Sequence, residues 1–137
     1  MTGKWFLIFV LFAYEGLCVT EIRLPDRNIT YTRNELNLFA PSIGIPKLWI
    51  GTLRSCHIIF PDGRSYEAYP GNTIPSPNLS FLRTTIPEFQ NCAVGFRHDI
   101  ATSYSGTYEL VSTVLHSEDN SVSVTRKRFN LVINERV

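Results

Sequence analysis

The chain has 137 residues, a formal net charge of +1 and a hydrophobic share of 44%. A chain of this length can build one domain with a modest core. The nearly balanced charge gives no reason to expect a nucleic acid or an acidic membrane surface as the partner.

Residues 1–18 are expected to be a secretory signal peptide. Lys4 supplies a positive charge, an apolar run (WFLIFVLFAY) occupies residues 5–14, and small or weakly polar residues follow at Gly16, Cys18 and Thr20. This order is typical of a cleaved export signal. The apolar run is shorter than the roughly 20 residues that a membrane-spanning helix needs, although a short anchor that stays attached is the alternative. We expect cleavage after Cys18, with a cut after Thr20 as the alternative. Cleavage after Cys18 leaves residues 19–137 as a single secreted, extracellular domain without stable membrane insertion.

Removal of the signal peptide leaves two of the three cysteines, Cys56 and Cys92. In an oxidising compartment an even pair is expected to form one disulfide, with two buried free thiols as the alternative. Asn28 and Asn78 each begin an N-x-[ST] tripeptide beside a proline-containing polar stretch. Both are therefore candidate N-glycosylation sites in an exported chain of eukaryotic origin.

The mature chain is expected to consist of β-strands. No window shows sustained apolar residues at helical spacing, and eight prolines and eight glycines interrupt the chain at short intervals. Short strands separated by frequent turns indicate an all-β, antiparallel two-sheet β-sandwich. In chain order, the expected strands cover residues 29–32, 36–41, 56–60, 64–69, 81–86, 92–96, 106–115 and 122–134, with a long polar loop over 70–78.

The expected strand at residues 56–60 ends in a sharp turn. Cys56 and Ile58 share one face of this strand, because side chains alternate along a strand. Pro61, Asp62 and Gly63 follow, and each favours a turn for its own reason: proline presets φ, the aspartate side chain bonds to its own backbone, and glycine accepts a positive φ. A tight hairpin is therefore expected here.

The last expected strand has an inconsistent apolar pattern. Val122 and Val124 lie on one face, whereas Phe129 and Leu131 have the opposite parity. Because a slip of one residue moves every side chain to the other face, we expect a bulge or bend near residues 126–128.

Residues 103–110 (SYSGTYEL) resemble the entry to strand F of an immunoglobulin-like domain. In that family the pattern is Asp-x-Gly-x-Tyr-x-Cys, and the tyrosine hydroxyl bonds back to the upstream backbone. Position by position, Gly106 takes the place of the turn glycine and Tyr108 that of the corner tyrosine. Leu110 takes the place of the strand-F cysteine and would fill the core. The resemblance implies an immunoglobulin-like β-sandwich.

The sequence also departs from the family pattern. By the resemblance, Cys56 falls on strand B and Cys92 on strand E, which are neighbours in one sheet, so a bridge between adjacent strands is implied. Tyr104 replaces the usual Asp, so the salt bridge of that Asp cannot form. The tight turn after Phe60 conflicts with the assignment, because strands B and C lie in opposite sheets. Divergent secreted single-domain members of the family, of the kind found in arthropods, are similar to this chain.

No arrangement of residues indicates catalysis. His57, His98 and His116 have no second histidine or cysteine at a metal-binding spacing. Serine-hydrolase motifs and glycine-rich phosphate loops are absent from the sequence. We therefore expect no enzyme activity, no metal site and no cofactor.

Two groups of residues are candidates for binding. Arg126, Lys127 and Arg128 form a basic cluster that could meet a sulfated glycan or an acidic partner, or could simply protect a sheet edge from aggregation. Tyr66 and Tyr69 form the second group, because tyrosine is enriched at interfaces, although strand tyrosines are also often half-buried.

The sequence therefore predicts a secreted immunoglobulin-like binding module. Its partner would be an extracellular or cell-surface protein or glycan, and not a nucleic acid. The alternative is a secreted β-sandwich carrier, whose aromatic residues would enclose a small apolar ligand.

Overall fold

The computed structural model of the protein describes residues 19–33, 40–47 and 51–135. The expected signal peptide and most of the strand expected over residues 36–41 lie outside the described residues. The described residues form the strands β1 (Val19–Arg23), β2 (Arg27–Thr32), β3 (Ser42–Ile45), β4 (Thr52–Ile59), β5 (Ser65–Tyr69), β6 (Leu79–Phe81), β7 (Cys92–Phe96), β8 (Gly106–Leu115) and β9 (Val122–Asn134), and the short 3-10 helices η2 (Pro87–Phe89) and η3 (Thr102–Tyr104).

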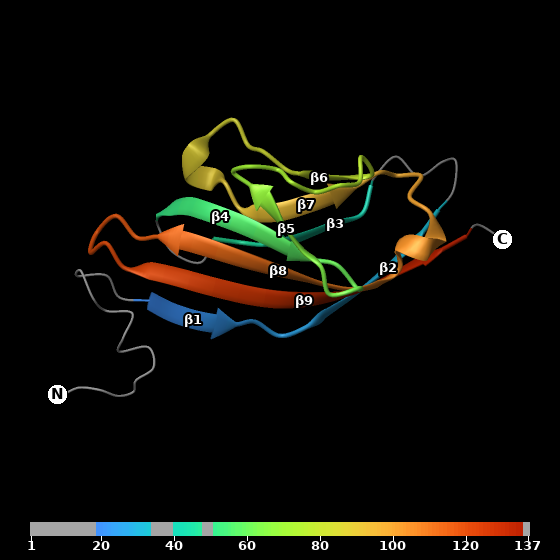
Figure 1. Ribbon diagram of the computed structural model, residues 1–137, viewed down its shortest axis with the longest axis horizontal. Coiled ribbons are helices and arrows are strands. Elements are labelled where there is room, and N and C mark those ends of the chain that lie inside the picture. The colour runs from blue at the N-terminus through green and yellow to red at the C-terminus, as the bar shows by residue number, and fades with distance from the viewer. Residues whose placement is uncertain (1–18, 34–39, 48–50, 136–137) are drawn as a thin grey trace.

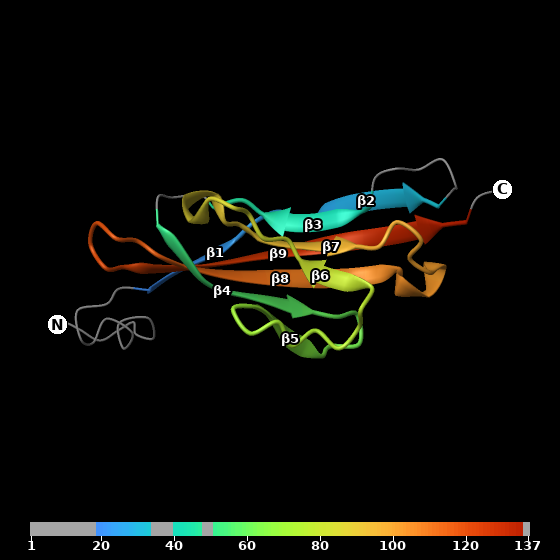
Figure 2. The same ribbon diagram turned by 90° about the horizontal axis from the view of Figure 1, so that it is seen from above.

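The strands form two sheets that lie one above the other (Figures 1 and 2). The larger sheet has the order β1-β9-β8-β4-β5, and β2 also pairs with β9. The smaller sheet has the order β3-β7-β6. The pairs of β1 and β2 with β9 are parallel, and the other strand pairs are antiparallel. This architecture confirms the expected all-β two-sheet sandwich.

One expected strand is displaced along the chain. The strand expected over residues 81–86 begins two residues earlier, as β6, and already ends at Phe81, and the residues after it form a loop. The buried side chain of Gln90 holds this loop: its Oε1 accepts a hydrogen bond from the Thr84 backbone N–H, and its Nε2 donates to the Leu82 and Asn91 carbonyls. The Gln90 side-chain amide thus bonds to backbone N–H and C=O groups that would bond to a neighbouring strand if β6 were longer.

The bulge expected near residues 126–128 is not present, so that prediction was wrong. The pairing of β8 with β9 runs without interruption from Gly106 opposite Leu131 to Leu115 opposite Val122. The side chains of Ser123 and Thr125 therefore lie on the same inner face as Phe129. The register of β9 with β8 is thus continuous, and its consequence is that the hydroxyl groups of Ser123 and Thr125 lie inside the sandwich.

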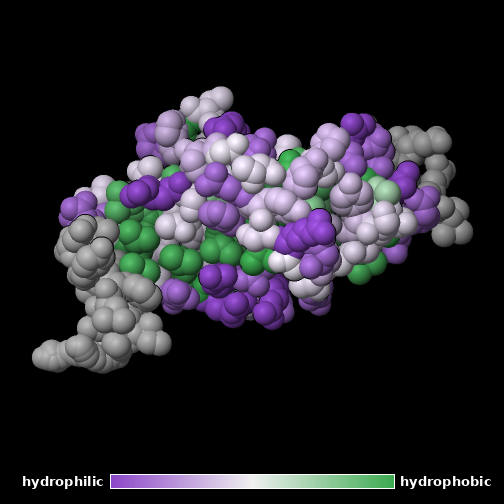
Figure 3. Space-filling model, in the orientation of Figure 1, coloured by the Kyte–Doolittle hydropathy of each residue, from purple (hydrophilic) through white to green (hydrophobic). Residues whose placement is uncertain are grey.

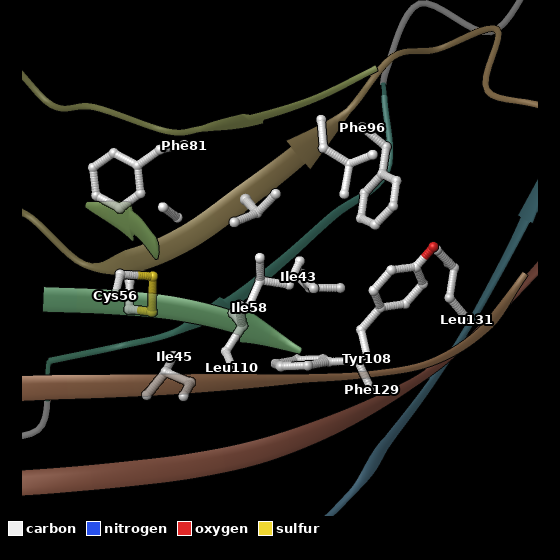
Figure 4. Close-up of a cluster of buried hydrophobic side chains, with 14 of the residues drawn as sticks. Ile43, Ile45, Cys56, Ile58, Phe81, Phe96, Tyr108, Leu110, Phe129 and Leu131 are labelled. Carbon is white, nitrogen blue, oxygen red and sulfur yellow. A yellow bond between two sulfur atoms is a disulfide. The ribbon is translucent and has the colours of Figure 1, made fainter. Parts of the chain in front are cut away.

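The core lies between the two sheets. Its largest fully buried side chains include those of Tyr108, Phe129, Ile58 and Leu110 from the larger sheet and Val94 from the smaller one. Figure 4 shows these aliphatic and aromatic groups filling the space between the layers. The interior is therefore packed with the chain's own side chains.

The disulfide joins the two sheets. Cys56 on β4 and Cys92 on β7 are bonded with a Cα–Cα distance of 5.2 Å (Figure 4). The expected disulfide is present, but the implied bridge between adjacent strands of one sheet is wrong. The resemblance placed Cys56 on the strand that pairs with the strand of Cys92. In the structure β3 is that strand, and Cys56 lies on the next strand, β4, which belongs to the larger sheet.

The same reassignment removes the conflict over the turn after Phe60. Strands β4 and β5 are antiparallel neighbours, so a tight hairpin between them is required. The Phe60 N–H donates to the Arg64 carbonyl and the Gly63 N–H to the Phe60 carbonyl. The Asp62 carboxylate accepts from the Arg64 N–H at 2.9 Å, and Gly63 has a φ of 90°. The turn forms by the expected contacts.

Candidate binding face

Strand β8 is anchored where it begins. The Tyr108 hydroxyl donates a hydrogen bond of 2.7 Å to the Tyr104 carbonyl, which is the bond that the family resemblance implies. Gly106 has a φ of 151°, and a Cβ there would lie 2.6 Å from the Pro61 side chain. Burial, reinforced by Tyr104 and Asp62, raises the pKa of Tyr108 to about 12. These contacts fix which side chains of β8 face outward.

The outer face of the larger sheet carries several apolar side chains at the end next to the β8–β9 hairpin, with Thr113 of β8 and Glu21 of β1 beside Val124 among them. On β9, Val122 and Val124 face outward, and Val19 on β1 lies opposite Val122. On β8, Val111 and Leu115 face the same way. We call these five partly exposed residues the valine face. Figure 3 shows apolar side chains gathered at this end of the sheet.

The inner side of the same strand ends carries several polar side chains beside the buried Val114. Ser112, His116, Ser123 and Thr125 are all buried there, and His116 Nε2 lies 2.6 Å from Ser123 Oγ. A sheet with one face packed on a core normally places its apolar residues inward and its polar residues outward. On β9 between Val122 and Thr125 this order is reversed, and on β8 it is mixed, because Val111 and Leu115 face outward while Val114 is buried inside and Thr113 lies on the outer face. Packing inside this domain therefore gives no reason for the apolar side chains of the valine face, and contiguous apolar patches commonly mark interaction sites.

A group of charged residues borders the valine face. The Glu109 carboxylate on β8 lies 3.3 Å from Arg126, 3.3 Å from Arg128 and 3.5 Å from Arg23. The Glu109 side chain is only 12% exposed, whereas the arginines are 36–51% exposed. We call these four residues the arginine cluster. Three guanidinium groups share one carboxylate, so the cluster keeps an excess of positive charge that faces solvent.

The structure divides the basic cluster seen in the sequence. Arg126 and Arg128 point outward to Glu109, but Lys127 lies on the inner side of β9, with its ammonium 5.6 Å from the centre of the Phe129 ring. Strand β9 pairs with β8 on one side and with β1 and β2 on the other. The alternative that these charges protect a sheet edge is therefore wrong, because β9 is not at an edge.

The two candidate tyrosines pack into the sandwich. The Tyr66 ring lies 5.0 Å from the Phe60 ring, and the Tyr69 ring stacks on Phe81 at 5.0 Å. Arg83 lies over the Tyr69 ring at 5.5 Å. These contacts join strands and sheets to one another, so both tyrosines have a structural role, away from the valine face.

The two candidate glycosylation sites lie on different sheets. Asn28 is exposed on β2, and its Oδ1 accepts a hydrogen bond of 2.8 Å from Asn130. Asn78 precedes β6, and its Nδ2 donates to the Tyr104 hydroxyl at 3.0 Å. Together with a bond to Ser76, this contact lowers the pKa of Tyr104 below its usual value. Modification of either asparagine stays a prediction.

The valine face and Glu109 were missed by the sequence analysis. The signal for Val122 and Val124 was present, because their parity disagrees with that of Phe129; we interpreted it as a bulge rather than as outward-facing valines. The grouping of Glu109 with Arg23 and Arg126 depends on pairing between residues far apart in the chain, which the sequence does not reveal.

No model of a protein family matches this sequence, and no curated protein matches it. Solved structures do. Murine CRIg has a TM-score of 0.53 at 12% identity, covering 79% of this chain and 92% of that one. The immunoglobulin-like domain of human Leucine-rich repeat-containing protein 4 has a TM-score of 0.46 at 15% identity, covering 82% and 84%. Human T-cell immunoglobulin and mucin domain protein 1 has a TM-score of 0.40 at 14% identity, covering 84% and 99%.

At these identities the comparison concerns the fold, and the score for murine CRIg supports it. The fold is immunoglobulin-like, as the residues around Tyr108 predicted. The similarity to secreted arthropod members stays a prediction. Within the described residues, no helix has the length and apolar character needed to cross a membrane.

Proposed function

We propose that this immunoglobulin-like domain is a secreted binding module that recognises an extracellular or cell-surface protein through the valine face and the arginine cluster. Residues 1–18 would be removed on export, and residues 19–137 would act as one disulfide-bonded domain. The reversed polarity of β9 between Val122 and Thr125, with valines outside and hydroxyls inside, next to the outward-facing Val111 and Leu115 of β8, is the observation that carries the proposal.

The chemistry of the face indicates the kind of partner. Apolar side chains next to exposed arginines match a surface with an apolar centre and acidic groups beside it. A sulfated glycan could satisfy Arg126 and Arg128, but it has few apolar groups to cover Val122 and Val124. We therefore favour a protein over a glycan.

The carrier alternative has less support. It requires an apolar cavity between the sheets, and side chains such as those of Ile58, Phe96 and Phe129 occupy that space. A binding function needs only the outer surface, where the unexplained apolar residues are. For the same reason we propose binding rather than catalysis.

Capture from intact cells tests the proposal. The tagged secreted domain would be compared with the variant Val124→Lys, which places a charge in the valine face. The matched control is Val132→Lys, because Val132 lies on the same outer face of β9 at the other end and is 47% exposed. We expect wild type and Val132→Lys to capture the same surface protein and Val124→Lys to lose it. Capture by all three proteins alike would refute this use of the valine face.

A further inference from the structure

The outer face of the smaller sheet contains an open pocket of about 310 Å³. Its floor crosses three strands: Ser42 on β3 and Ser80 on β6 are both opposite Gly95 on β7. At one end lie Asn78 and Arg97, and the Arg97 N–H donates to the Asn78 carbonyl at 2.9 Å. The pocket lies on the other sheet from the valine face.

Two of the residues that line this pocket, Asn78 and Ser80, belong to one N-x-[ST] tripeptide. A glycan attached to Asn78 would therefore begin at the edge of the pocket. We propose that the pocket holds the first sugars of an N-linked glycan carried by Asn78. The proposal rests on export of the chain, because N-glycans are added in the secretory pathway.

The hydrogen bonds of Asn78 allow this modification. The Nδ2 atom has two hydrogens, and one of them serves the bond to the Tyr104 hydroxyl. In glycan transfer from a lipid-linked diphosphate donor, the bond between C1 of the first sugar and the phosphate oxygen breaks, and the phosphate leaves with its electron pair. A C1–Nδ2 bond forms, and Nδ2 loses one hydrogen as a proton. The other hydrogen can keep its bond to Tyr104.

The lining of the pocket suits a sugar. Pro77 and Leu82, both exposed, offer apolar surface to the C–H groups of an N-acetylglucosamine ring, and Ser42 and Arg97 offer polar groups to its hydroxyls and acetamide. Leu82 is 42% exposed, and a sugar in the pocket would cover it. The volume is near the lower end of small-molecule sites, about 300–1,000 Å³, which fits the first one or two sugars.

Gly95 keeps the floor of the pocket open. A Cβ at this position would project between the two serines and lie 2.9 Å from the Leu82 side chain. Glycine inside a strand otherwise destabilises the strand relative to alanine. Gly95→Ala is therefore a useful variant: it should be harmless to the bare domain and harmful to the seated sugar.

Thermal unfolding of the secreted full chain tests the proposal. Ser80→Ala removes the acceptor hydroxyl and prevents glycosylation of Asn78 while it keeps the amide that bonds to Tyr104. Thr30→Ala does the same for Asn28, which lies outside the pocket, and serves as the matched control. We expect Ser80→Ala to lower the melting temperature by about 3–5 °C and Thr30→Ala to leave it within about 1 °C.

Two further measurements distinguish the effect of losing the sugar from the effect of the Ser80→Ala substitution itself. Trimming the glycan with an endoglycosidase that leaves the first N-acetylglucosamine should preserve most of the stabilisation. In a Gly95→Ala background the loss of melting temperature caused by Ser80→Ala should be at most half as large as in wild type, as a double-mutant cycle measures.

The contrary outcomes are distinct. A secreted chain without a glycan at Asn78 overturns this inference alone, whereas a chain that is never exported overturns the proposed function with it. A glycan at Asn78 that adds no stability, or a stabilisation that Gly95→Ala does not reduce, shows that the sugar does not occupy the pocket.

Discussion

The alkaline stability of the domain should depend on Tyr108. This buried residue has an ordinary pKa of about 10 in the unfolded chain, and burial raises its pKa to about 12 in the folded domain. Below pH 10 both states keep the proton, so the stability is fully present. Between pH 10 and pH 12 the unfolded state loses the proton first, and the free energy of unfolding falls. Two pKa units correspond to about 2.7 kcal/mol.

The variant Tyr108→Phe isolates this effect. It loses the hydrogen bond to the Tyr104 carbonyl, so at pH 8 its free energy of unfolding should be about 1–2 kcal/mol below that of wild type. It has no hydroxyl to ionise at this position, and the other tyrosines ionise in both proteins. The two stabilities should therefore meet at about pH 11–11.5, and at higher pH wild type should be the less stable protein.

Urea unfolding followed by circular dichroism at pH 8, 10 and 11.5 provides the measurement. Wild type should lose stability relative to Tyr108→Phe across this range. Parallel curves, with the same difference at pH 8 and pH 11.5, would show that the Tyr108 hydroxyl is not held protonated by its burial. The reasoning about the anchor of β8 would then be wrong.

Replacing Cys56 and Cys92 together by alanine should lower the free energy of unfolding, measured in urea, by about 3–5 kcal/mol. Unreduced peptide maps of wild type should contain the linked pair of cysteines, and two free thiols would contradict the fold. Gln90→Leu leaves backbone groups of the β6–β7 loop without their partners, so the free energy of unfolding should fall by about 1–3 kcal/mol. The Thr84 backbone amide should also exchange its hydrogen with solvent faster, and an unchanged exchange rate would show that Gln90 does not hold the loop. Arg126→Ala should weaken binding to the captured protein and reduce its dependence on salt, measured by surface plasmon resonance at two ionic strengths; the same salt dependence as wild type would exclude the arginine cluster from the interface.

Local features of the fold could be predicted from the sequence. The alternation of Cys56 and Ile58, the turn at Asp62 and Gly63, and the bond of Tyr108 each depend on residues close together in the chain. Side-chain period and turn chemistry determine such features without knowledge of the rest of the molecule.

Features that depend on long-range pairing could not be predicted in the same way. Alternation places Cys56 on an inner face, but it does not say which sheet that face belongs to, so the bridge to Cys92 was assigned to the wrong strands. The parity change in β9 had two solutions, a bulge or a reversal of polarity. The sequence does not distinguish them, because the choice depends on the register with β8 and on the burial of Ser123.

Photo-crosslinking from the valine face tests the central claim most directly. A diazirine side chain would replace Val124 in one protein and Val132 in another, and each would be irradiated on cells that bind the wild-type domain. The account predicts a covalent adduct with the captured surface protein from position 124 and none from position 132. An adduct from position 132 alone, or equal adducts from both positions, would contradict it.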